Sequence, residues 1–151
     1  MNVYLSGGME YASDEGRGWR EEMEQWLQRE LSWTSFNPNR ESERFLQAQA
    51  PGTDFRDLKS GDPGRFRALV RRIVELDCRA VAEQSDLVVC YWDESAHRGA
   101  GTKGEITIAR YFNKPVYLVT SVPERDIPGW VLGCVTRIFP DFNALRNFLK
   151  P

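Results

Sequence analysis

Short apolar runs alternate with longer segments of helical periodicity along this chain. Runs of β-branched and aromatic residues predict five strands, at residues 2–6, 33–36, 86–91, 116–119 and 136–139. Apolar residues spaced three and four apart predict the main helices, at residues 14–31, 63–84, 102–112, 128–134 and 141–149. Strands that alternate with helices indicate an α/β fold, with a parallel sheet covered on both faces. We predict one domain spanning residues 1–151.

The expected strand order places the glycine-rich segments at one edge of the sheet. We predict a doubly wound, Rossmann- or flavodoxin-like sheet of five parallel strands in the order 2-1-3-4-5. Such sheets bind ligands at the carboxyl ends of the strands, where the first and third strands are neighbours. The candidate substrate-binding residues at that edge are Ser6, Gly7, Gly8, Met9, Trp92, Asp93, Gly101 and Thr102.

The segment 38–62 is the irregular part of the pattern. We expect a short helix over residues 40–49, followed by turn-forming residues such as Pro51-Gly52. A connection of this length is usually functional or disordered. It leaves the carboxyl end of the second strand and carries Phe55 and Arg56, so it could fold over the ligand as a lid. A floppy insertion is the alternative.

Glu105 has two interpretations. A helix starting near Thr102 would place Glu105 on one face with Ile108, Ala109 and Phe112, so the carboxylate would point toward the sheet or a cleft. Alternatively, Thr102 and Glu105 form a capping box at the amino end of the helix. The two interpretations differ in the direction of the glutamate side chain.

Asp77 is a second carboxylate on an apolar helix face. It shares the inward stripe of the 63–84 helix with residues such as Leu69, Ile73 and Val81. A carboxylate in that position is costly unless it is paired or hydrogen-bonded. It is therefore either a satisfied structural group or a site residue.

Composition and charge exclude several classes of function. The chain has 41% hydrophobic and 28% charged residues, as in a soluble globular protein, and a net charge of −2, which argues against binding a nucleic-acid polymer. Its apolar runs are too short to span a membrane. Three widely spaced cysteines, and a first strand without a preceding signal segment, lead us to expect a cytoplasmic protein with reduced thiols. With one histidine, we expect no metal site, and we expect no cofactor.

The predicted edge favours chemistry carried out by carboxylates. It lacks a serine–histidine or cysteine–histidine arrangement and a phosphate-binding Gly-x-x-x-x-Gly-Lys-Ser/Thr motif. It offers Asp77, Asp93 and Glu105 beside flat side chains such as Trp92. Carboxylate pairs with aromatic platforms suit glycosidic-bond cleavage, in which one ionised carboxylate attacks the anomeric carbon and a protonated group assists the leaving base.

Four segments, taken in order, resemble the nucleoside 2-deoxyribosyltransferase family. They are Val3-Tyr4-Leu5-Ser6-Gly7-Gly8-Met9, Asp77 nine residues before Asp86-Leu87-Val88-Val89, Gly101-Thr102-Lys103-Gly104-Glu105-Ile106, and Lys114-Pro115-Val116. The superfamily includes deoxynucleoside-monophosphate and cytidine-monophosphate N-glycosidases. The resemblance implies a glutamate nucleophile at Glu105, a tyrosine at Tyr4 that orients it, and an aspartate at Asp77 that assists the base. It also implies a homodimer or larger homo-oligomer.

The sequence departs from the family pattern at the substrate-recognition positions. His97, Arg98 and Gly99 stand where the transferases often have an acidic residue. The first glycine-rich loop has Ser6 but continues to Glu10, with Arg17 and Arg20 farther along, so a 5′-phosphate is left open. The expected function is N-glycosidic bond cleavage or (deoxy)ribosyl transfer on a nucleoside or nucleoside monophosphate, through a glycosyl-Glu105 intermediate. A non-catalytic nucleotide-binding or sensor module is the alternative.

Overall fold

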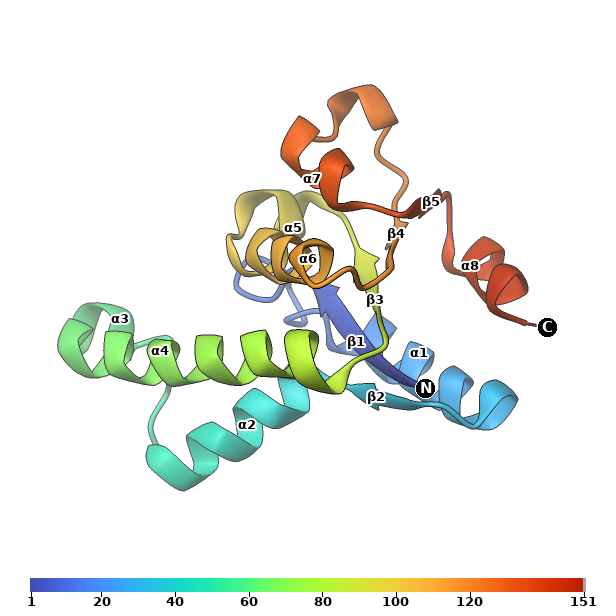
Figure 1. Cartoon of the computed structure of the whole chain (residues 1–151). Helices are drawn as coiled ribbons and strands as arrows, with labels where there is room; N and C mark the ends of the chain where they lie inside the picture. The colour runs from blue at the N-terminus through green and yellow to red at the C-terminus, as the bar shows by residue number, and fades with distance from the viewer. Residues whose placement is uncertain (151) are drawn as a thin grey trace.

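A five-stranded parallel sheet forms the centre of the computed structural model, which describes residues 1–150 (Figure 1). The strands are β1 (Asn2–Gly7), β2 (Thr34–Phe36), β3 (Leu87–Tyr91), β4 (Val116–Val119) and β5 (Arg137–Phe139). Their order is β2-β1-β3-β4-β5, and every neighbouring pair is parallel. The α/β fold and the predicted strand order are therefore confirmed. β1 and β3 are adjacent, with Ser6 opposite Cys90 and Gly7 opposite Tyr91, so the chain reverses its direction of winding beside the first glycine-rich loop.

Helices connect consecutive strands. They are α1 (Arg17–Leu31), α2 (Pro38–Gln49), α3 (Leu58–Gly61), α4 (Pro63–Arg79), α5 (Glu94–Arg98), α6 (Gly101–Tyr111), α7 (Gly129–Cys134) and α8 (Phe142–Leu149). A π-helical turn, η1 (Ala80–Gln84), continues α4 toward β3, and a 3₁₀ turn, η2 (Glu124–Asp126), precedes α7. None of the helices in residues 1–150 has both the length and the apolar character needed to cross a membrane.

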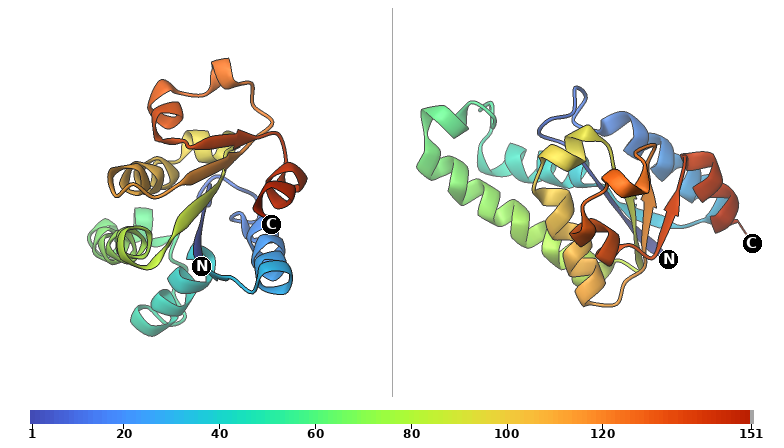
Figure 2. Two further views of the ribbon diagram at one scale, coloured as in Figure 1. Left: turned by 45° about the vertical axis from the view of Figure 1, so that its right-hand side comes forward. Right: turned by 90° about the horizontal axis from the view of Figure 1, so that it is seen from above.

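Alternate side chains of the strands build two separate cores, because successive residues of a strand point to opposite faces. Tyr4, Val88 and Cys90 pack with η1, α5, α6 and α7 on one face of the sheet. Val3 and Leu5 pack with α1 and α8 on the other face. The left view of Figure 2 shows this division, with α1 and α8 together on one side of the strands.

The predicted helix boundaries need correction at α1 and α2. α1 starts at Arg17 rather than residue 14, because Glu15 and Gly16 have left-handed backbones with φ of 56° and 70°. Asp14 instead accepts hydrogen bonds from the backbone N–H groups of Gly16 and Gly18, at 2.8 and 3.0 Å. The segment 38–62 is also less irregular than predicted, since α2 begins at Pro38 and α3 follows it.

The amino end of α6 contradicts the capping-box interpretation. α6 begins at Gly101 with Ala100 as its N-cap residue, so Thr102 lies inside the first turn. Thr102, Ile106 and Ala109 form the buried face of this helix, and Glu105 lies beside them. The expectation that Phe112 points inward is wrong, because its side chain is 51% exposed at the end of the helix. The helix begins earlier than predicted and presents a different face to the sheet.

Candidate active site

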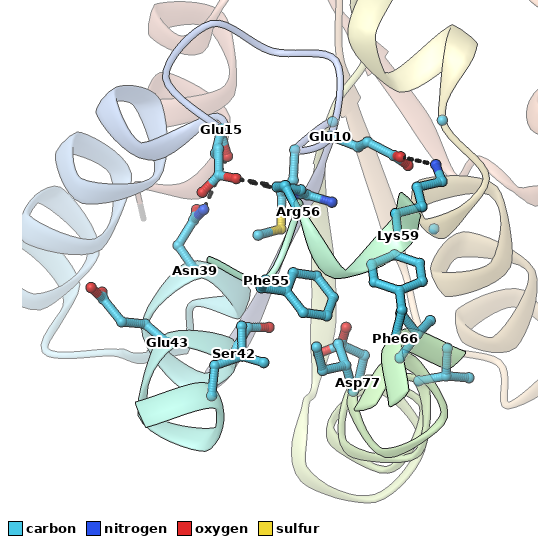
Figure 3. Close-up of a pocket in the computed structure, with 18 of the residues that line it drawn as sticks. Glu10, Glu15, Asn39, Ser42, Glu43, Phe55, Arg56, Lys59, Phe66 and Asp77 are labelled. Carbon is cyan, nitrogen blue, oxygen red and sulfur yellow. Dashed lines mark hydrogen bonds and ion pairs between the residues drawn. The ribbon is translucent and has the colours of Figure 1, made fainter. Parts of the chain in front are cut away.

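A cavity of about 490 Å³ lies at the carboxyl end of β1, between the sheet edge and the α2–α4 segment (Figure 3). Its floor includes Gly7 and Gly8 from the first glycine-rich loop, and Gly101 and Glu105 from α6. Residues from α2, the α2–α3 connection and α4 form the opposite wall. The volume falls in the range of small-molecule binding sites, and the position is the one at which doubly wound sheets bind ligands.

Glu105 lies in the second turn of α6 and faces β1 across the cavity floor. Its carboxylate accepts a short hydrogen bond from the hydroxyl of Ser6. Burial raises the pKa of Glu105, while the Ser6 hydrogen bond and the positive charge of Arg20 act in the opposite direction. These two interactions, and the nearby hydroxyl of Tyr4, favour the ionised carboxylate, which is the form that a nucleophile requires.

Asp77 reaches the same cavity from α4, close to the point where that helix becomes the π-helical turn η1. Burial raises the pKa of Asp77 to about 8, and the negative charge of Glu105 contributes to the rise. Asp77 is therefore largely protonated at neutral pH. A protonated carboxyl beside an ionised one is the division between acid and base that glycosidic chemistry uses.

Tyr4 lies beneath the two carboxylates in the middle of β1. The side chain is fully buried, and its ring stacks on Phe36 with 5.2 Å between ring centroids. Its hydroxyl has no hydrogen-bond partner among residues 1–150. Burial raises the pKa of the phenol, and the charges of Glu105 and Asp77 raise it further. Tyr4 is therefore a neutral phenol whose hydroxyl lies close to both carboxylates.

The first glycine-rich loop approaches α5 so closely that Gly8 has no room for a side chain. A Cβ atom at Gly8 would overlap the Ser95 hydroxyl and lie 2.7 Å from the Ala96 nitrogen. At the end of the loop, Gly16 has φ of 70°, and a Cβ there would collide with the Arg20 guanidinium. Glycine is needed at both positions for the loop to lie against the sheet edge.

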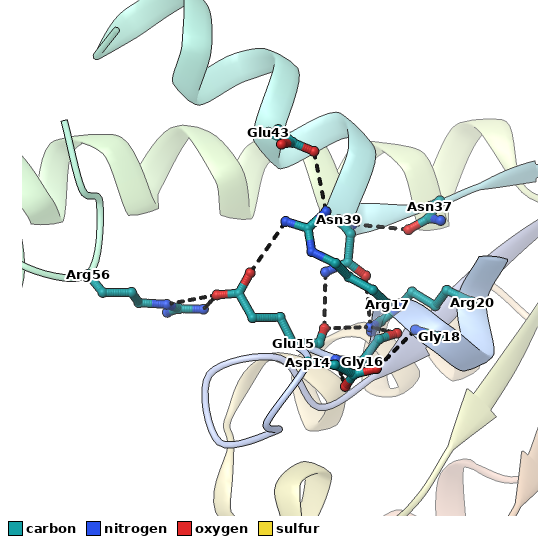
Figure 4. A network of polar contacts seen from close by, with 10 residues as sticks. All are labelled: Asp14, Glu15, Gly16, Arg17, Gly18, Arg20, Asn37, Asn39, Glu43 and Arg56. Atoms are coloured by element: carbon teal, nitrogen blue, oxygen red, sulfur yellow. Dashed lines mark hydrogen bonds and ion pairs between the residues drawn. The ribbon is translucent and has the colours of Figure 1, made fainter. Parts of the chain in front are cut away.

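Four ion pairs join charged side chains that line the cavity. Arg56 contacts Glu15 at 3.3 Å, and Lys59 contacts Glu10 at 2.5 Å. Arg17 bridges Glu15 and Glu43, at 3.6 and 3.3 Å. Figure 4 shows the network around Glu15, in which both arginines approach one carboxylate. Each cationic side chain that lines the cavity is thus already paired with a carboxylate.

The α2–α4 segment supplies the apolar wall of the cavity and also carries Asp77. Phe55 and Phe66 stack with 4.9 Å between their centroids, and both line the cavity. Figure 3 shows their rings above Asp77. Leu46, Val70 and Ile73 extend the same wall. A flat, partly apolar ligand could therefore lie between this wall and Glu105 of α6.

The structure brings together most of the residues that the sequence indicated. Gly7, Gly8, Met9, Gly101 and Thr102 line the cavity with Asp77 and Glu105. Ser6 contacts Glu105, and Tyr4 lies below it.

Trp92 and Asp93 do not line the cavity, which corrects the sequence-based expectation. Trp92 is 1% exposed and packs in the core formed by α5, α6 and α7. Asp93 is the N-cap residue of α5 and accepts hydrogen bonds from the Ser95 hydroxyl and the Ala96 backbone, at 2.5 and 2.9 Å. Helix α5 was not predicted, and its N-cap turns Asp93 away from the site.

Arg20 is buried directly behind the first loop, whereas the sequence suggested only an arginine farther along the chain that could bear on phosphate binding. A signal for its burial was present, because Arg20 shares a face of α1 with Met23 and Leu27 at spacings of three and seven residues. An arginine at a core-facing position indicates a buried, hydrogen-bonded charge. Within residues 1–150, no cluster of histidine, cysteine or acidic residues has the arrangement of a metal site.

Comparisons with known proteins relate this chain to two solved structures at the level of the fold. The CMP N-glycosidase BcmB of Clostridium botulinum is 17% identical, with a TM-score of 0.56 over 99% of this chain and 98% of that protein. A conserved protein from Enterococcus faecalis V583 is 18% identical, with a TM-score of 0.57 over 97% and 95% of the two chains. No protein-family model matches the sequence, and a search of curated proteins finds no significant match.

Proposed function

We propose that this protein cleaves the N-glycosidic bond of a nucleoside-type substrate through a covalent glycosyl-Glu105 intermediate. The observation that carries the proposal is a pair of carboxylates, on different helices, that share one cavity but differ in the groups that contact them. Glu105 accepts a hydrogen bond from Ser6, whereas Asp77 has a pKa raised to about 8. The fold shared with the CMP N-glycosidase supports the reaction class.

The first step uses both carboxylates in complementary roles. A carboxylate oxygen of Glu105 attacks C1′, and the bond between C1′ and the base nitrogen breaks. The bonding electron pair leaves with the base, which takes the proton of Asp77. The products are a glycosyl ester on Glu105, a neutral base and an ionised Asp77. General acid assistance of this kind contributes about 10²–10⁴-fold to a rate.

The second step regenerates the enzyme. A water molecule, or the ring nitrogen of a second base, attacks C1′ and gives its proton to the Asp77 carboxylate. The C1′–O bond of the ester breaks, and its electron pair returns to Glu105. Attack by water is hydrolysis, and attack by a second base is transfer. In this proposal Tyr4 donates a hydrogen bond to Glu105 as the ester forms and breaks, and the proximity of its hydroxyl to both carboxylates supports that role.

Trapping the intermediate tests the proposal directly. The protein is incubated with 2′-fluoro-2′-deoxynucleosides and their 5′-monophosphates, and its intact mass is measured. Fluorine at C2′ destabilises the oxocarbenium-like transition states, so the glycosyl-enzyme is expected to accumulate. The expected result is an added mass equal to the fluorinated sugar, which peptide mapping assigns to Glu105.

The matched controls are Glu105→Gln and Glu75→Gln. Glu75 lies on α4 in an exposed pair with Arg72, so its variant should label like the wild type. An adduct that persists in Glu105→Gln would place the nucleophile elsewhere. Tight nucleotide binding without an adduct, and without release of base after long incubation, would favour the sensor interpretation instead.

A further inference from the structure

Arg20 is a buried cation whose hydrogen-bond acceptors are all neutral. Its side chain is 1% exposed, and it is the one lysine or arginine that is buried among residues 1–150. Its acceptors are four backbone carbonyl oxygens and one amide oxygen. They belong to Leu5 (3.0 Å), Gly7 (2.7 Å), Glu15 (3.2 Å), Gly16 (3.0 Å) and Asn39 (3.1 Å). A buried charge without a contacting counterion is expensive to maintain.

Two of these acceptors flank the residue that contacts Glu105. Arg20 Nε donates to the carbonyl of Leu5, and Nη2 donates to the carbonyl of Gly7. Ser6 lies between them, and its hydroxyl donates to the Glu105 carboxylate. The guanidinium therefore holds the backbone on both sides of Ser6, which fixes the position of that hydroxyl donor.

The other contacts hold the first loop in an unfavourable conformation. Glu15 has a left-handed backbone with φ of 56°, which is uncommon for a residue with a side chain. Its carbonyl accepts hydrogen bonds from Arg20 and from the Asn39 amide. Gly16, also left-handed, accepts another from Arg20. The loop that forms the cavity floor is thus attached to α1 through one side chain.

Glu105 is surrounded by titratable groups from several elements, and Arg20 is the one positive charge among them. β1 contributes Tyr4, β3 contributes Cys90, α4 contributes Asp77 and Cys78, and α1 contributes Arg20. Burial raises the pKa of the phenol, both thiols and Asp77, so these groups are largely neutral at pH 7. Burial also raises the pKa of Glu105, and Arg20 is the buried positive charge that opposes this rise.

We propose that Arg20 is a positioning residue for Glu105. It acts as the buried counterion of the carboxylate and holds the backbone around Ser6 that supplies its hydrogen bond. This inference rests on the proposed function, because the kinetic effects that we expect assume that Glu105 is the nucleophile. Arg20 lies outside the cavity and acts on Glu105 indirectly. This role also separates Arg20 from substrate binding, since all of its donors are engaged within the protein.

Two substitutions separate the charge of Arg20 from its hydrogen bonds. Arg20→Met removes both, whereas Arg20→Lys keeps the charge but cannot hold Leu5 and Gly7 together. The pH dependence of kcat/KM is measured for each, with Arg29→Met as the matched control. Arg29 lies on the same helix but is exposed and paired with Glu30, so its variant should match the wild type.

The expected results differ between the two variants. In Arg20→Met the acid limb should move to higher pH by roughly one unit or more, because an opposite charge lowers the pKa of a nearby carboxyl by about that amount. In Arg20→Lys the acid limb should stay within about 0.3 unit of the wild type, with kcat reduced about tenfold or more. An unmoved acid limb in a folded Arg20→Met protein would overturn the counterion role.

Two further arrangements keep the test decisive. If Arg20→Met does not fold, as judged by circular dichroism, the Arg20→Lys profile decides. In Arg20→Lys, a kcat equal to that of the wild type, or an acid limb displaced in pH, would then contradict the proposal. If the wild type shows no glycosidic cleavage, the proposed function is wrong. The role of Arg20 is then tested separately, by following the ¹³C NMR signal of the Glu105 carboxyl carbon during a pH titration of the wild type and the variants. The same displacement is expected in that titration, and its absence would refute the proposal.

Discussion

At the residue scale, Asp77 and Glu105 differ in what stabilises their charge. Glu105 accepts a hydrogen bond from Ser6 and interacts with the Arg20 charge. Asp77 is buried and close to the Glu105 charge, with a pKa raised to about 8. Proximity alone would make the two groups compete for one proton. Their surroundings decide which carboxyl keeps it.

The pKa directions predict a bell-shaped dependence of kcat/KM on pH. Activity should fall as pH drops through the pKa of Glu105, because the nucleophile becomes protonated, and this pKa lies above the usual range for glutamate. Activity should also fall as pH rises through about 8, because Asp77 loses the proton that the base needs. Initial rates measured from about pH 4 to 10 test both limbs.

Asp77→Asn provides the residue-specific check of that profile. Asparagine keeps the size of the side chain but cannot donate a proton at any pH, so kcat should drop about 10²–10⁴-fold. The basic limb near pH 8 should vanish while the acid limb remains. A variant that retains a basic limb at the same pH would assign that limb to another group.

Sequence spacing identified some of these residues and concealed others. Asp77 and Glu105 could be selected because each places a carboxylate near an apolar helix face. Tyr4 gives no such signal, since a tyrosine within a strand is ordinary core, and only the family resemblance marked it. The burial of Arg20 was missed because arginine is normally assigned to the surface, although its spacing from Met23 and Leu27 places it on the buried face.

At the element scale, the site depends on how closely the first loop approaches α5. Gly8→Ala would place a methyl group against the Ser95 side chain and the Ala96 backbone. We expect a loss of about 1–3 kcal/mol in the free energy of unfolding, together with lower kcat, because the loop must move away from α5. Urea denaturation and initial rates measure the two effects.

Gly133→Ala is the control for this substitution. Gly133 lies in α7, and a Cβ atom there would have no neighbour within 4 Å. Alanine in a helix is favoured over glycine by about 0.5–1 kcal/mol, so this variant should be as stable as the wild type or more so. Equal destabilisation of both variants would show that steric overlap at Gly8 is not the cause.

The aromatic wall built by the α2–α4 segment gives a second prediction at this scale. Phe55 lines the cavity and stacks on Phe66 of α4. If the base lies against this wall, Phe55→Ala should raise KM about tenfold, since stacking on an aromatic side chain contributes roughly 1–3 kcal/mol per base. The chemical step should change much less, because Phe55 is on the wall opposite Glu105.

Phe112→Ala is the comparison, since Phe112 is exposed at the end of α6 and does not line the cavity. Its KM should equal that of the wild type. If Phe55→Ala instead lowers kcat with an unchanged KM, Phe55 does not bind the ground-state substrate, and the base must lie elsewhere.

Strong periodicity made most elements predictable, and local side-chain contacts made their ends unpredictable. β4 was predicted without error because Lys114-Pro115 and Thr120 delimit a short apolar run. The start of α1 was misplaced because Asp14 looks like a first-turn acid but closes a turn before the helix. α5 was overlooked because its five residues carry too little hydrophobic periodicity to stand out. Whether the α2–α3 region acts as a lid stays a prediction.

At the scale of the whole molecule, the distribution of charge bears on the choice of substrate. The cavity is lined by five carboxylates and three basic side chains, and all three basic side chains are already paired with Glu10, Glu15 or Glu43. A 5′-phosphate would have to break such a pair and would meet the remaining negative charge. We expect kcat/KM for a 2′-deoxynucleoside to exceed that for its monophosphate about tenfold.

Glu15→Gln provides the sharper test of this preference. It would release Arg17 and Arg56 from their shared carboxylate and should shift the preference toward the monophosphate. Glu75→Gln removes a carboxylate from an exposed pair on α4 and should leave the ratio unchanged. A wild-type preference for the monophosphate would show that the ion pairs open for substrate. The expected homodimer or larger assembly also stays a prediction.

The sheet order has a consequence for how the chain folds. β1 is an inner strand of the sheet, yet its partner β3 comes much later in the chain, since Val3 pairs with Leu87. The cavity floor therefore cannot assemble during synthesis until β3 and α6 have left the ribosome. Closing a long loop costs entropy that grows only with the logarithm of its length, so the residues of segment 38–62 add just a few tenths of a kcal/mol to this search. Segments placed between β1 and β3 can lengthen or shorten with little effect on folding, which makes this connection a permissive place for substrate-binding walls to diversify.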